Sequence, residues 1–394
     1  MLHKYTKKIF QHLSKIQGGR LSLTLPNQHQ EIFGDTTLYN QAPIELTIND
    51  WKVFNLIISR GDIGFAESYI QGLWTTNDLE GLIRLILINR KTLEDLIYGS
   101  FLGSIFYRIK HFFHKNTRSG SKKNIHAHYD LGNEFYKLWL DPSMMYSSAL
   151  FQGDFSQSLQ SAQTAKIQKI LAELKCSPND AILEIGCGWG GFMEASLNQG
   201  LKVTGLTLSH EQKKYIETKL SNPARAEVLF MDYRDSMKQY DGIASIEMFE
   251  AVGEDYWPAY FDTLYRCLKP GKRAVIQTIV IVDHLFEKYR SETDFIQQYI
   301  FPGGMLPSEK IFRDSAQRAG LKLVTEFAFG EDYAQTLRIW RNSFTAELPK
   351  IRQLGFNDEF IRLWDFYLMY CAAGFAEKNI DVIQFTLEKP HEAP

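Results

Sequence analysis

The sequence predicts a doubly wound α/β domain that follows a smaller α+β domain. From residue 160 onward, helical stretches alternate with short apolar segments that read "AILEI", "KVTGL", "AEVLF", "GIASI" and "RAVIQTIVI". Aliphatic and β-branched strands between helices are typical of a parallel sheet covered on both faces. A glycine-rich turn directly follows the first of these strands, and a length of 394 residues suits two domains of ordinary size.

The first 98 residues indicate the smaller α+β domain. Apolar residues recur at helical spacing near the start, with lysines among them: Leu2, Tyr5, Ile9, Leu13 and Ile16. This segment is either an interfacial helix that binds anionic lipid or the first helix of a small domain with a solvated basic face. Residues 20–98 then mix the strand-like runs "RLSLTL" and "IELTI" with longer helical stretches.

The charge is unevenly distributed along the chain. The formal net charge is only −2, which gives no reason to expect a nucleic-acid partner, and the 44% hydrophobic content is ordinary for a globular protein. Residues 1–124, however, hold 16 Lys+Arg and 10 Asp+Glu, which leaves 28 and 36 for the remainder. We therefore expect the N-terminal part to face an anionic partner.

A basic stretch at 108–123, "RIKHFFHKNTRSGSKK", marks the expected domain boundary. We predict an N-terminal domain over 1–107 that faces lipid or membrane, a basic linker over 108–124, and a catalytic domain over 125–394. Phe112 and Phe113 lie among the basic residues, a combination that suits the headgroup region of an anionic bilayer. A solvated tether is the alternative.

Cysteine usage and hydropathy indicate the cellular compartment. The four cysteines are widely spaced, without a CxxC pair or a secretory leader, so a reducing cytoplasm fits best. No apolar run approaches the roughly 18 residues of a membrane span. His126 and His128 form an HxH, but no carboxylate or cysteine cluster completes a metal site. We expect a cytoplasmic protein, at most peripheral on the inner face of the cell membrane, without a metal.

The glycine-rich turn after "AILEI" has the pattern ExGxGxG. Glycines at alternate positions let the backbone pass close to a ligand, and the following helix presents free N–H groups. Nicotinamide sites use a similar turn, and a purely structural turn is a further alternative. The acidic residue before the glycines resembles motif I of class I S-adenosylmethionine (SAM) methyltransferases. The candidate SAM-binding residues here are Glu184, Gly186, Cys187, Gly188, Trp189 and Gly190.

Two further strand ends supply candidates for binding the rest of the cofactor. Thr207, Ser209 and Gln212 lie in "GLTLSHEQ", where many such enzymes have an acidic residue for the ribose hydroxyls. Asp232 and Tyr233 lie in "MDYRD", at the usual position for contacting adenine. Asp232 is alternatively a helix cap.

Long strings of the sequence resemble the cyclopropane fatty acid synthases and their mycolic acid cyclopropane synthase relatives. The strings run from about residue 125 to the C-terminus in the family's order: "AHYDLGNEFYKLWLDPSMMYSSALF", "LEIGCGWGGF", "GLTLSHEQ", "DYRD", "EMFEAVG", "LKPG", "DFIQQYIFPGGMLPS", "DYAQTL" and "FYLMYCAAGF". The resemblance implies a class I SAM methyltransferase fold with a helical insertion, for which we expect residues 283–305. The N-terminal part resembles that of the bacterial phospholipid-acting members, which favours membrane phospholipid as the substrate.

The implied reaction adds the SAM methyl group to a cis double bond of an acyl chain, removes a proton from that methyl group and closes a cyclopropane ring. A carbocation must survive in the site, and aromatic faces can stabilise it without capturing it. The alternative for each aromatic residue is a place in the hydrophobic core. The matching segments supply Tyr129, Phe135, Tyr146, Phe249, Tyr299, Phe301, Tyr333, Phe366 and Tyr367.

The resemblance implies that a bound bicarbonate ion, rather than a side chain, accepts the proton. By position, Glu250, Tyr333 and the backbone of Ile279 would hold the ion. Ser148 and Gln277 stand where the family mostly has Cys and His; both keep a hydrogen-bond donor but remove a titratable thiol and imidazole. Glu250 is the strongest catalytic candidate because it lies at the end of a predicted sheet strand.

Other readings stay open at this point. A branch of similar enzymes makes methylene- or methyl-branched chains, and "QTI" and "GGMLPS" also resemble that branch. Less favoured are a small-molecule methyltransferase and a non-catalytic SAM- or membrane-binding protein. Cys371 matches a cysteine proposed as catalytic in the family, and is alternatively a small core residue. Tyr146 and Ser147 complete the SAM-binding candidates. Dimerisation would let two basic N-terminal domains share one membrane.

Overall fold

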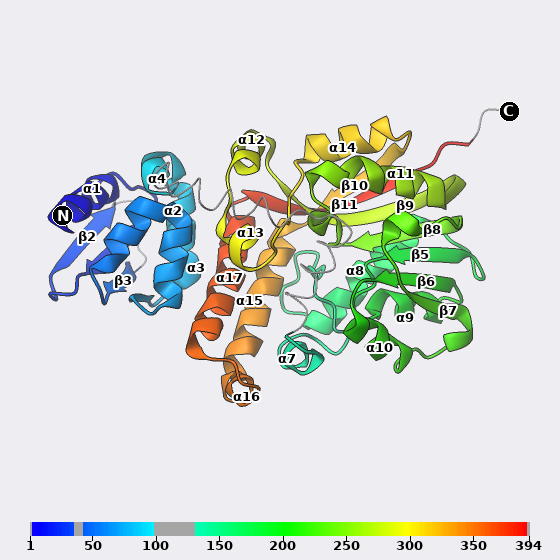
Figure 1. Cartoon of the computed structure of the whole chain (residues 1–394), viewed down its shortest axis with the longest axis horizontal. Coiled ribbons are helices and arrows are strands. Elements are labelled where there is room, and N and C mark those ends of the chain that lie inside the picture. The colour runs from blue at the N-terminus through cyan, green and yellow to red at the C-terminus, as the bar shows by residue number, and fades with distance from the viewer. Residues whose placement is uncertain (1, 35–41, 98–130, 392–394) are drawn as a thin grey trace. The chain divides into compact units, whose positions relative to one another are not determined.

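The computed structural model describes residues 2–34, 42–97 and 131–391, and these form two compact units (Figure 1). The first unit joins Met1–Phe113 to two later segments, Lys288–Ile300 and Thr345–Lys378. The second comprises His114–Glu287, Phe301–Phe344 and Asn379–Pro394. The predicted linker at 108–124 lies outside the described residues, as do His126, His128 and Tyr129, so the proposed boundary there stays a prediction.

The N-terminal part of the first unit has the predicted α+β character. Its elements are α1 (Leu2–Leu13), β1 (Arg20–Thr24), β2 (Gln30–Gly34), β3 (Ile44–Ile48), α2 (Lys52–Ile70), β4 (Trp74–Thr76), α3 (Leu79–Ile88) and α4 (Arg90–Ile97). The strands form one sheet in the order β2-β1-β3-β4, in which only the β1–β3 pair is parallel.

The apolar face of α1 belongs to the core of this unit. Ile9 and, just beyond the helix, Ile16 are both buried, and the Phe10 ring meets the Phe33 ring of β2 edge to face with centroids 5.2 Å apart. Lys7 and Lys8 are exposed. This packing favours the first helix of a small domain over a helix whose apolar side is available to lipid.

Later segments of the chain complete the first unit. They carry the end of α12 (Asp283–Ser291), α13 (Phe295–Tyr299), α16 (Leu348–Gln353) and α17 (Asp358–Ala376). The Tyr299 hydroxyl donates to Glu67 at 2.5 Å, and the Tyr69 hydroxyl donates to Asp365 at 2.7 Å. The helical insertion expected at 283–305 is therefore present as α12 and α13.

The second unit is built on a seven-stranded sheet in the order β10-β11-β9-β8-β5-β6-β7. The strands are β5 (Ala181–Ile185), β6 (Lys202–Thr207), β7 (Ala226–Phe230), β8 (Tyr240–Ile246), β9 (Leu268–Ile281), β10 (Lys322–Ala328) and β11 (Ile380–Glu388). The neighbouring strands β7, β6, β5, β8 and β9 are parallel, as predicted. By contrast, β11 runs antiparallel to both β9 and β10.

Helices cover both faces of this sheet, which confirms the doubly wound α/β fold. The α-helices are α7 (Asn133–Lys137), α8 (Leu159–Leu174), α9 (Gly191–Asn198), α10 (His210–Glu217), α11 (Trp257–Cys267), α14 (Glu309–Arg318) and α15 (Gly330–Ala346); short 3₁₀ helices span Pro223–Arg225, Tyr233–Asp235, Phe249–Ala251 and Glu254–Tyr256. In Figure 1, α11 and α14 lie on the opposite face from α9 and α10. One buried cluster, which includes Ile170, Ile182, Phe192 and Val203, joins the sheet to α8 and α9.

Candidate active site

The turn between β5 and α9 is shaped for close approach of a ligand. Gly186 and Gly188 both have positive φ, +83° and +51°. A β-carbon on Gly186 would lie 2.7 Å from Cγ of Met248, so only glycine fits there, whereas a β-carbon on Gly188 would point into open space. The N–H groups of Gly186 and Cys187 both donate to the Leu206 carbonyl, which fixes the turn against β6.

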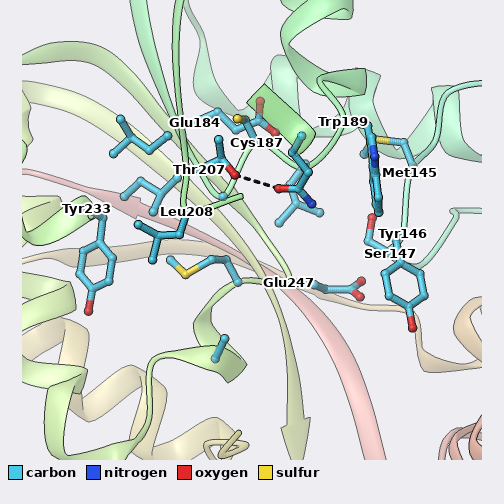
Figure 2. Close-up of a pocket in the computed structure, with 18 of the residues that line it drawn as sticks. Met145, Tyr146, Ser147, Glu184, Cys187, Trp189, Thr207, Leu208, Tyr233 and Glu247 are labelled. Atoms are coloured by element: carbon cyan, nitrogen blue, oxygen red, sulfur yellow. Dashed lines mark hydrogen bonds between the residues drawn. The ribbon is translucent and has the colours of Figure 1, made fainter. Parts of the chain in front are cut away.

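A pocket opens above this turn, at the carboxyl ends of the parallel strands (Figure 2). Ligands of open α/β sheets bind in this position. Most of the predicted SAM-binding residues line the pocket: Tyr146, Ser147, Glu184, Gly186, Cys187, Gly188, Trp189, Thr207, Gln212 and Tyr233. Thr207 and Gln212 are hydrogen-bonded to each other, with the Thr207 hydroxyl donating to the Gln212 oxygen at 2.8 Å.

Three predicted SAM-binding residues do not line the pocket and have structural roles. Gly190 is the N-cap of α9 with φ +86°, and Ile216 packs beside it. The Ser209 hydroxyl caps α10 by accepting from the Gln212 N–H. Asp232 accepts hydrogen bonds from the Arg234 guanidinium on both oxygens, at 2.8 and 2.6 Å, so its carboxylate is already paired. Asp232 thus caps the short helix and pairs with Arg234, and its contact with adenine stays a prediction.

Two buried ionisable groups lie at the pocket: Glu184, which lines it, and Lys166, which contacts the lining residue Ser147. Burial raises the pKa of Glu184 to about 8, and its Oε2 has no hydrogen-bond partner among the described residues. Lys166 of α8 is fully buried and donates to the Ser147 hydroxyl at 2.6 Å. Burial lowers the pKa of Lys166 to about 8, against the attraction of Glu247, Asp141 and Glu184. The unpaired oxygen of Glu184 offers an acceptor to a cationic ligand.

Glu247 connects this pocket to the predicted catalytic residues. Its carboxylate lines the pocket and extends toward the segment that carries Tyr146 and Ser147 (Figure 2). Oε1 accepts from the Ser148 N–H at 2.8 Å and from the Gln277 side-chain amide at 2.7 Å. Oε2 accepts from the Tyr333 hydroxyl at 2.5 Å. Three predicted bicarbonate ligands thus converge on a carboxylate of the chain itself.

Gln277 is held by the neighbouring strand. It lies directly opposite Gln384 in the β9–β11 register, and the Gln384 amide donates to the Gln277 oxygen at 3.0 Å. This contact turns the amide nitrogen of Gln277 toward Glu247. The Ser148 hydroxyl instead donates to the Ala149 carbonyl at 2.9 Å, so its backbone, and not the predicted hydroxyl, contacts the carboxylate.

Glu250 has different surroundings. It lies in the short helix Phe249–Ala251 and accepts the Ile279 N–H on Oε1 at 2.5 Å. Its Oε2 is buried without a hydrogen-bond partner among the described residues. Burial, followed by the charge of Glu247, raises the pKa of Glu250 to about 8. Glu250 is not among the residues that line the pocket.

The structure brings together five of the six predicted catalytic residues. The Glu247 carboxylate accepts hydrogen bonds from Ser148, Gln277 and Tyr333. Glu250, three residues further along the chain, accepts from Ile279. Cys371 lies on α17 in the first unit, where burial raises the pKa of its thiol, and a catalytic role for it stays a prediction. Sequence reasoning missed Glu247, although it stands in the same string, "EMFEAVG", as Glu250. Ser148 and Gln277 replace the Cys and His that the family mostly has, and this replacement was the available signal that the site differs.

The predicted aromatic residues divide between the pocket and the core. Tyr146 lines the pocket, and its ring lies 5.5 Å from Trp139 and 5.4 Å from Trp340. Phe249 instead packs in the core against Tyr260 and Phe312. Phe366 and Tyr299 belong to the first unit, where both contact Phe295.

Comparison with protein families gives a match over most of the chain. Residues 115–385 match the family model described as mycolic acid cyclopropane synthetase. The tuberculostearic acid methyltransferase UfaA1 of Mycobacterium tuberculosis is 35% identical over 339 residues, covering 83% of this chain and 79% of the relative. The cyclopropane-fatty-acyl-phospholipid synthase of Escherichia coli K12 is 32% identical over 352 residues, 88% of each chain.

Solved structures give the same picture over 68% of the chain. The cyclopropane synthase MmaA2 from Mycobacterium tuberculosis superimposes with a TM-score of 0.64 at 30% identity, covering 68% of this chain and 97% of that one. The mycolic acid cyclopropane synthase CmaA1, in complex with SAH and CTAB, gives a TM-score of 0.63 at 32% identity, with coverage of 68% and 98%.

Proposed function

Because this chain belongs to the mycolic acid cyclopropane synthetase family and is a SAM-dependent methyltransferase of lipids, we propose that it acts on phospholipid. In this proposal it adds the SAM methyl group to the cis double bond of an unsaturated acyl chain and closes a cyclopropane ring. The observation that carries the proposal is the joining, through Glu247, of the pocket at the glycine turn to the cluster of Tyr333, Gln277 and Ser148.

The residues of the pocket fit SAM. The glycine turn leaves open space above Gly188, and the unpaired oxygen of Glu184 can accept from the ammonium group of the ligand. Thr207, Gln212 and Tyr233 would contact the nucleoside from the ends of β6 and β7. When bound, SAM supplies an electrophilic methyl group.

The side chains around the pocket suit a reaction through a carbocation. Tyr146 lines the pocket and packs against Trp139 and Trp340, so aromatic faces rather than water border this side. An aromatic face attracts a cation through its quadrupole but does not form a bond with it. Exclusion of water also protects the cation from hydrolysis.

The expected bicarbonate ion does not fit these surroundings. Ser148, Gln277 and Tyr333 already donate to Glu247, and the Ile279 N–H already donates to Glu250. A further anion here would also meet the Glu247 carboxylate, which has the same sign of charge. We therefore assign no step of the reaction to bicarbonate.

Phospholipid is favoured over other acyl carriers by the extent of the matches. The relative named a cyclopropane-fatty-acyl-phospholipid synthase covers 88% of this chain, whereas cyclopropane mycolic acid synthase 3 covers 68%. Residues 115–394 are less than 88% of the chain, so the longer match extends into the N-terminal residues, where Lys7 and Lys8 are exposed. We infer that this unit rests on an anionic membrane surface, so the enzyme would be peripheral on the cytoplasmic face, alone or as a homodimer. No helix among the described residues is both long and apolar enough to cross a bilayer.

A second product is supported by a specific match. The relative with 35% identity is named a methyltransferase, not a cyclopropane synthase. Methyl transfer followed by loss of a proton without ring closure would give a methylene-branched chain, which a reductase could convert to a methyl branch.

The experiment uses purified protein, isotopically labelled SAM and vesicles that contain cis-monounsaturated phospholipid. We expect label in the acyl chains and upfield ring protons in the NMR spectrum of the product. Label with olefinic methylene or methyl signals alone would shift the assignment to branching. Absence of label in lipid, with SAM binding intact, would refute the proposed substrate.

A further inference from the structure

Glu247 is the carboxylate that the pocket exposes to a bound substrate. It lines the pocket together with the glycine turn, whereas Glu250 does not (Figure 2). Its two oxygens receive three hydrogen bonds, from the Ser148 backbone, the Gln277 amide and the Tyr333 hydroxyl. A carboxylate in this position can act on a proton of the ligand because it is both oriented and accessible.

We propose that the Glu247 carboxylate is the proton acceptor of the reaction and takes the place that a bound bicarbonate holds in similar enzymes. A carboxylate and a bicarbonate ion both present two anionic oxygens in a plane, so one set of donors can hold either. In this chain the donors expected to bind the ion hold Glu247 instead. The inference rests on the proposed function and names the group that completes it.

The surroundings favour ionisation at Glu247 more than at Glu250. Burial raises the pKa of Glu247, but the hydrogen bonds from Tyr333, Ser148 and Gln277 and the charge of Lys166 oppose this rise. At Glu250, burial and the charge of Glu247 raise the pKa, and among the described residues no cation opposes this rise. Of two neighbouring carboxylates, the one whose charged form is stabilised by hydrogen bonds and by a cation ionises first.

The backbone at Glu247 supports a functional role. Its φ is +51°, a left-handed conformation that residues with a β-carbon adopt at a cost. Its N–H donates to the Gln277 carbonyl at 2.7 Å, which holds the turn at the end of β8. Strained residues of this kind concentrate at functional sites, where the surrounding structure maintains them.

The proton-transfer step balances without a further reactant. After the methyl group has joined one alkene carbon, the neighbouring carbon carries the positive charge. A C–H bond of the new methyl group breaks, its electron pair forms the bond to the cationic carbon, and the proton passes to Glu247. The ring is then neutral and Glu247 is a neutral carboxylic acid, which returns its proton to solvent after product release. For a branched product, a hydride would first shift from the methylated carbon to its cationic neighbour, which moves the positive charge to the carbon that bears the methyl group. The electron pair of the methyl C–H bond would then form a C=C bond, with the same proton acceptor.

The test compares the intact protein with three variants. Glu247→Gln removes the base and keeps the shape of the side chain, and Glu247→Gly removes the carboxylate while relieving the positive φ. Glu211→Gln, at an exposed position on α10, is the matched control. Methyl transfer to phospholipid vesicles is measured in buffer freed of carbon dioxide, with and without added bicarbonate. Binding of ¹³C-bicarbonate is measured separately by NMR, and SAM binding by calorimetry shows that each variant is folded.

We expect the wild-type rate to be the same with and without bicarbonate. Glu247→Gln should lose about 100-fold or more in rate, the range of a missing general base. Glu247→Gly should be inactive in bicarbonate-free buffer, recover at least about tenfold with bicarbonate, and bind the labelled ion, which the wild type should not. Glu211→Gln should behave as the wild type.

Dependence of the wild-type rate on bicarbonate, or a Glu247→Gln variant within about threefold of wild type, would overturn the proposal. If the wild type transfers no methyl group to any lipid, the proposed function fails on its own. The binding measurement still decides the role of Glu247 in that event: the proposal stands if only Glu247→Gly binds bicarbonate and falls if the wild type binds it equally well.

Discussion

Glu247 and Glu250 are three residues apart in the sequence, yet their carboxylates have opposite environments. Glu247 accepts three hydrogen bonds and has Lys166 as a nearby cation. Glu250 accepts the Ile279 N–H on one oxygen, and the charge of Glu247 adds to burial in raising its pKa to about 8. This asymmetry favours ionisation of Glu247 before Glu250 and a protonated Glu250 at neutral pH.

The protonated state of Glu250 predicts how stability depends on pH. Its pKa is raised to about 8 in the folded protein, from an ordinary value of 4.5, so the folded state holds the proton more tightly than the unfolded state. The stability gained at low pH is therefore lost as the pH rises from 5 to 8, by up to about 1 kcal/mol per pH unit. Glu250→Gln should show a smaller fall in melting temperature over this range than wild type. Glu211→Gln should keep the wild-type slope, and an unchanged slope in Glu250→Gln would contradict the assignment.

Tyr333 predicts a shift in the pH dependence of activity. Its hydroxyl donates to Glu247, which favours the ionised carboxylate. Tyr333→Phe keeps the ring but removes the donor, so the pKa of Glu247 should rise further. Because the base must be ionised to act, the acid limb of the kcat profile should move to higher pH. Tyr265→Phe, at a more exposed position, is the control, and an acid limb that does not move in Tyr333→Phe would argue against Glu247 as the base.

At the scale of residues, the sequence predicted the members of the site better than their roles. Position along the chain located Glu250, Tyr333, Gln277 and Ser148 correctly in one cluster. It could not show that a side chain, Glu247, fills the centre of that cluster, since this depends on a positive φ at the end of β8. The pairing of Asp232 with Arg234, two residues away, could not be predicted either, because it depends on local rotamers.

At the scale of elements, the turn between β5 and α9 combines two separate demands on glycine. Gly186 is required by packing, because a β-carbon would lie 2.7 Å from Met248. Packing does not require Gly188, because a β-carbon there meets open space in the pocket, so we propose that the ligand requires it. The two positions can therefore be distinguished by mutation.

Gly186→Ala and Gly188→Ala form a matched pair. Gly188→Ala adds a methyl group inside the pocket, so it should weaken SAM binding more than about tenfold while lowering stability only by the cost of its positive φ, about 1 kcal/mol. Gly186→Ala should lower the melting temperature more, because it adds a steric clash to the same cost. Calorimetric titration and thermal unfolding give both values. Wild-type SAM affinity in Gly188→Ala would show that the pocket is not the SAM site.

The sequence predicted the parallel core of the sheet because each of its strands, from β5 to β9, is an apolar run beside a helix. It did not resolve β10 and β11. Most side chains of β10 are exposed, so this strand lacks the continuous apolar pattern. Its pairing with β11 joins segments separated by the long helices α15 and α17, and such register is fixed by tertiary packing.

At the scale of the whole molecule, chain order does not follow spatial order. The hydrogen bonds from Tyr299 to Glu67 and from Tyr69 to Asp365 join residues 232 and 296 positions apart. Sequence patterns report local periodicity, so they could not assign Lys288–Ile300 and Thr345–Lys378 to the N-terminal unit. The predicted α+β character of that unit, by contrast, follows from short-range patterns and was confirmed.

The exposed lysines of α1 predict salt-sensitive binding to anionic vesicles. Lys7 and Lys8 are exposed on α1, and each basic residue near an anionic surface contributes about 1 kcal/mol. The double variant Lys7→Glu, Lys8→Glu should weaken vesicle binding at least about tenfold at low salt and much less at high salt. Lys214→Glu, Lys219→Glu, a matched pair of exposed residues in the second unit, should bind nearly as wild type. Cosedimentation measures both, and an equal loss in the two pairs would show that the attraction is not located on α1.

In the proposed reaction, the proton that is removed comes from the transferred methyl group. The most direct measurement supplies SAM with a trideuterated methyl group and counts deuterium in the product acyl chain by mass spectrometry. We predict two deuterium atoms on each added carbon, together with cyclopropane ring signals by NMR. Retention of all three would show that the proton leaves from elsewhere on the chain, and would contradict both ring closure and the placement of Glu247 beside the methyl group.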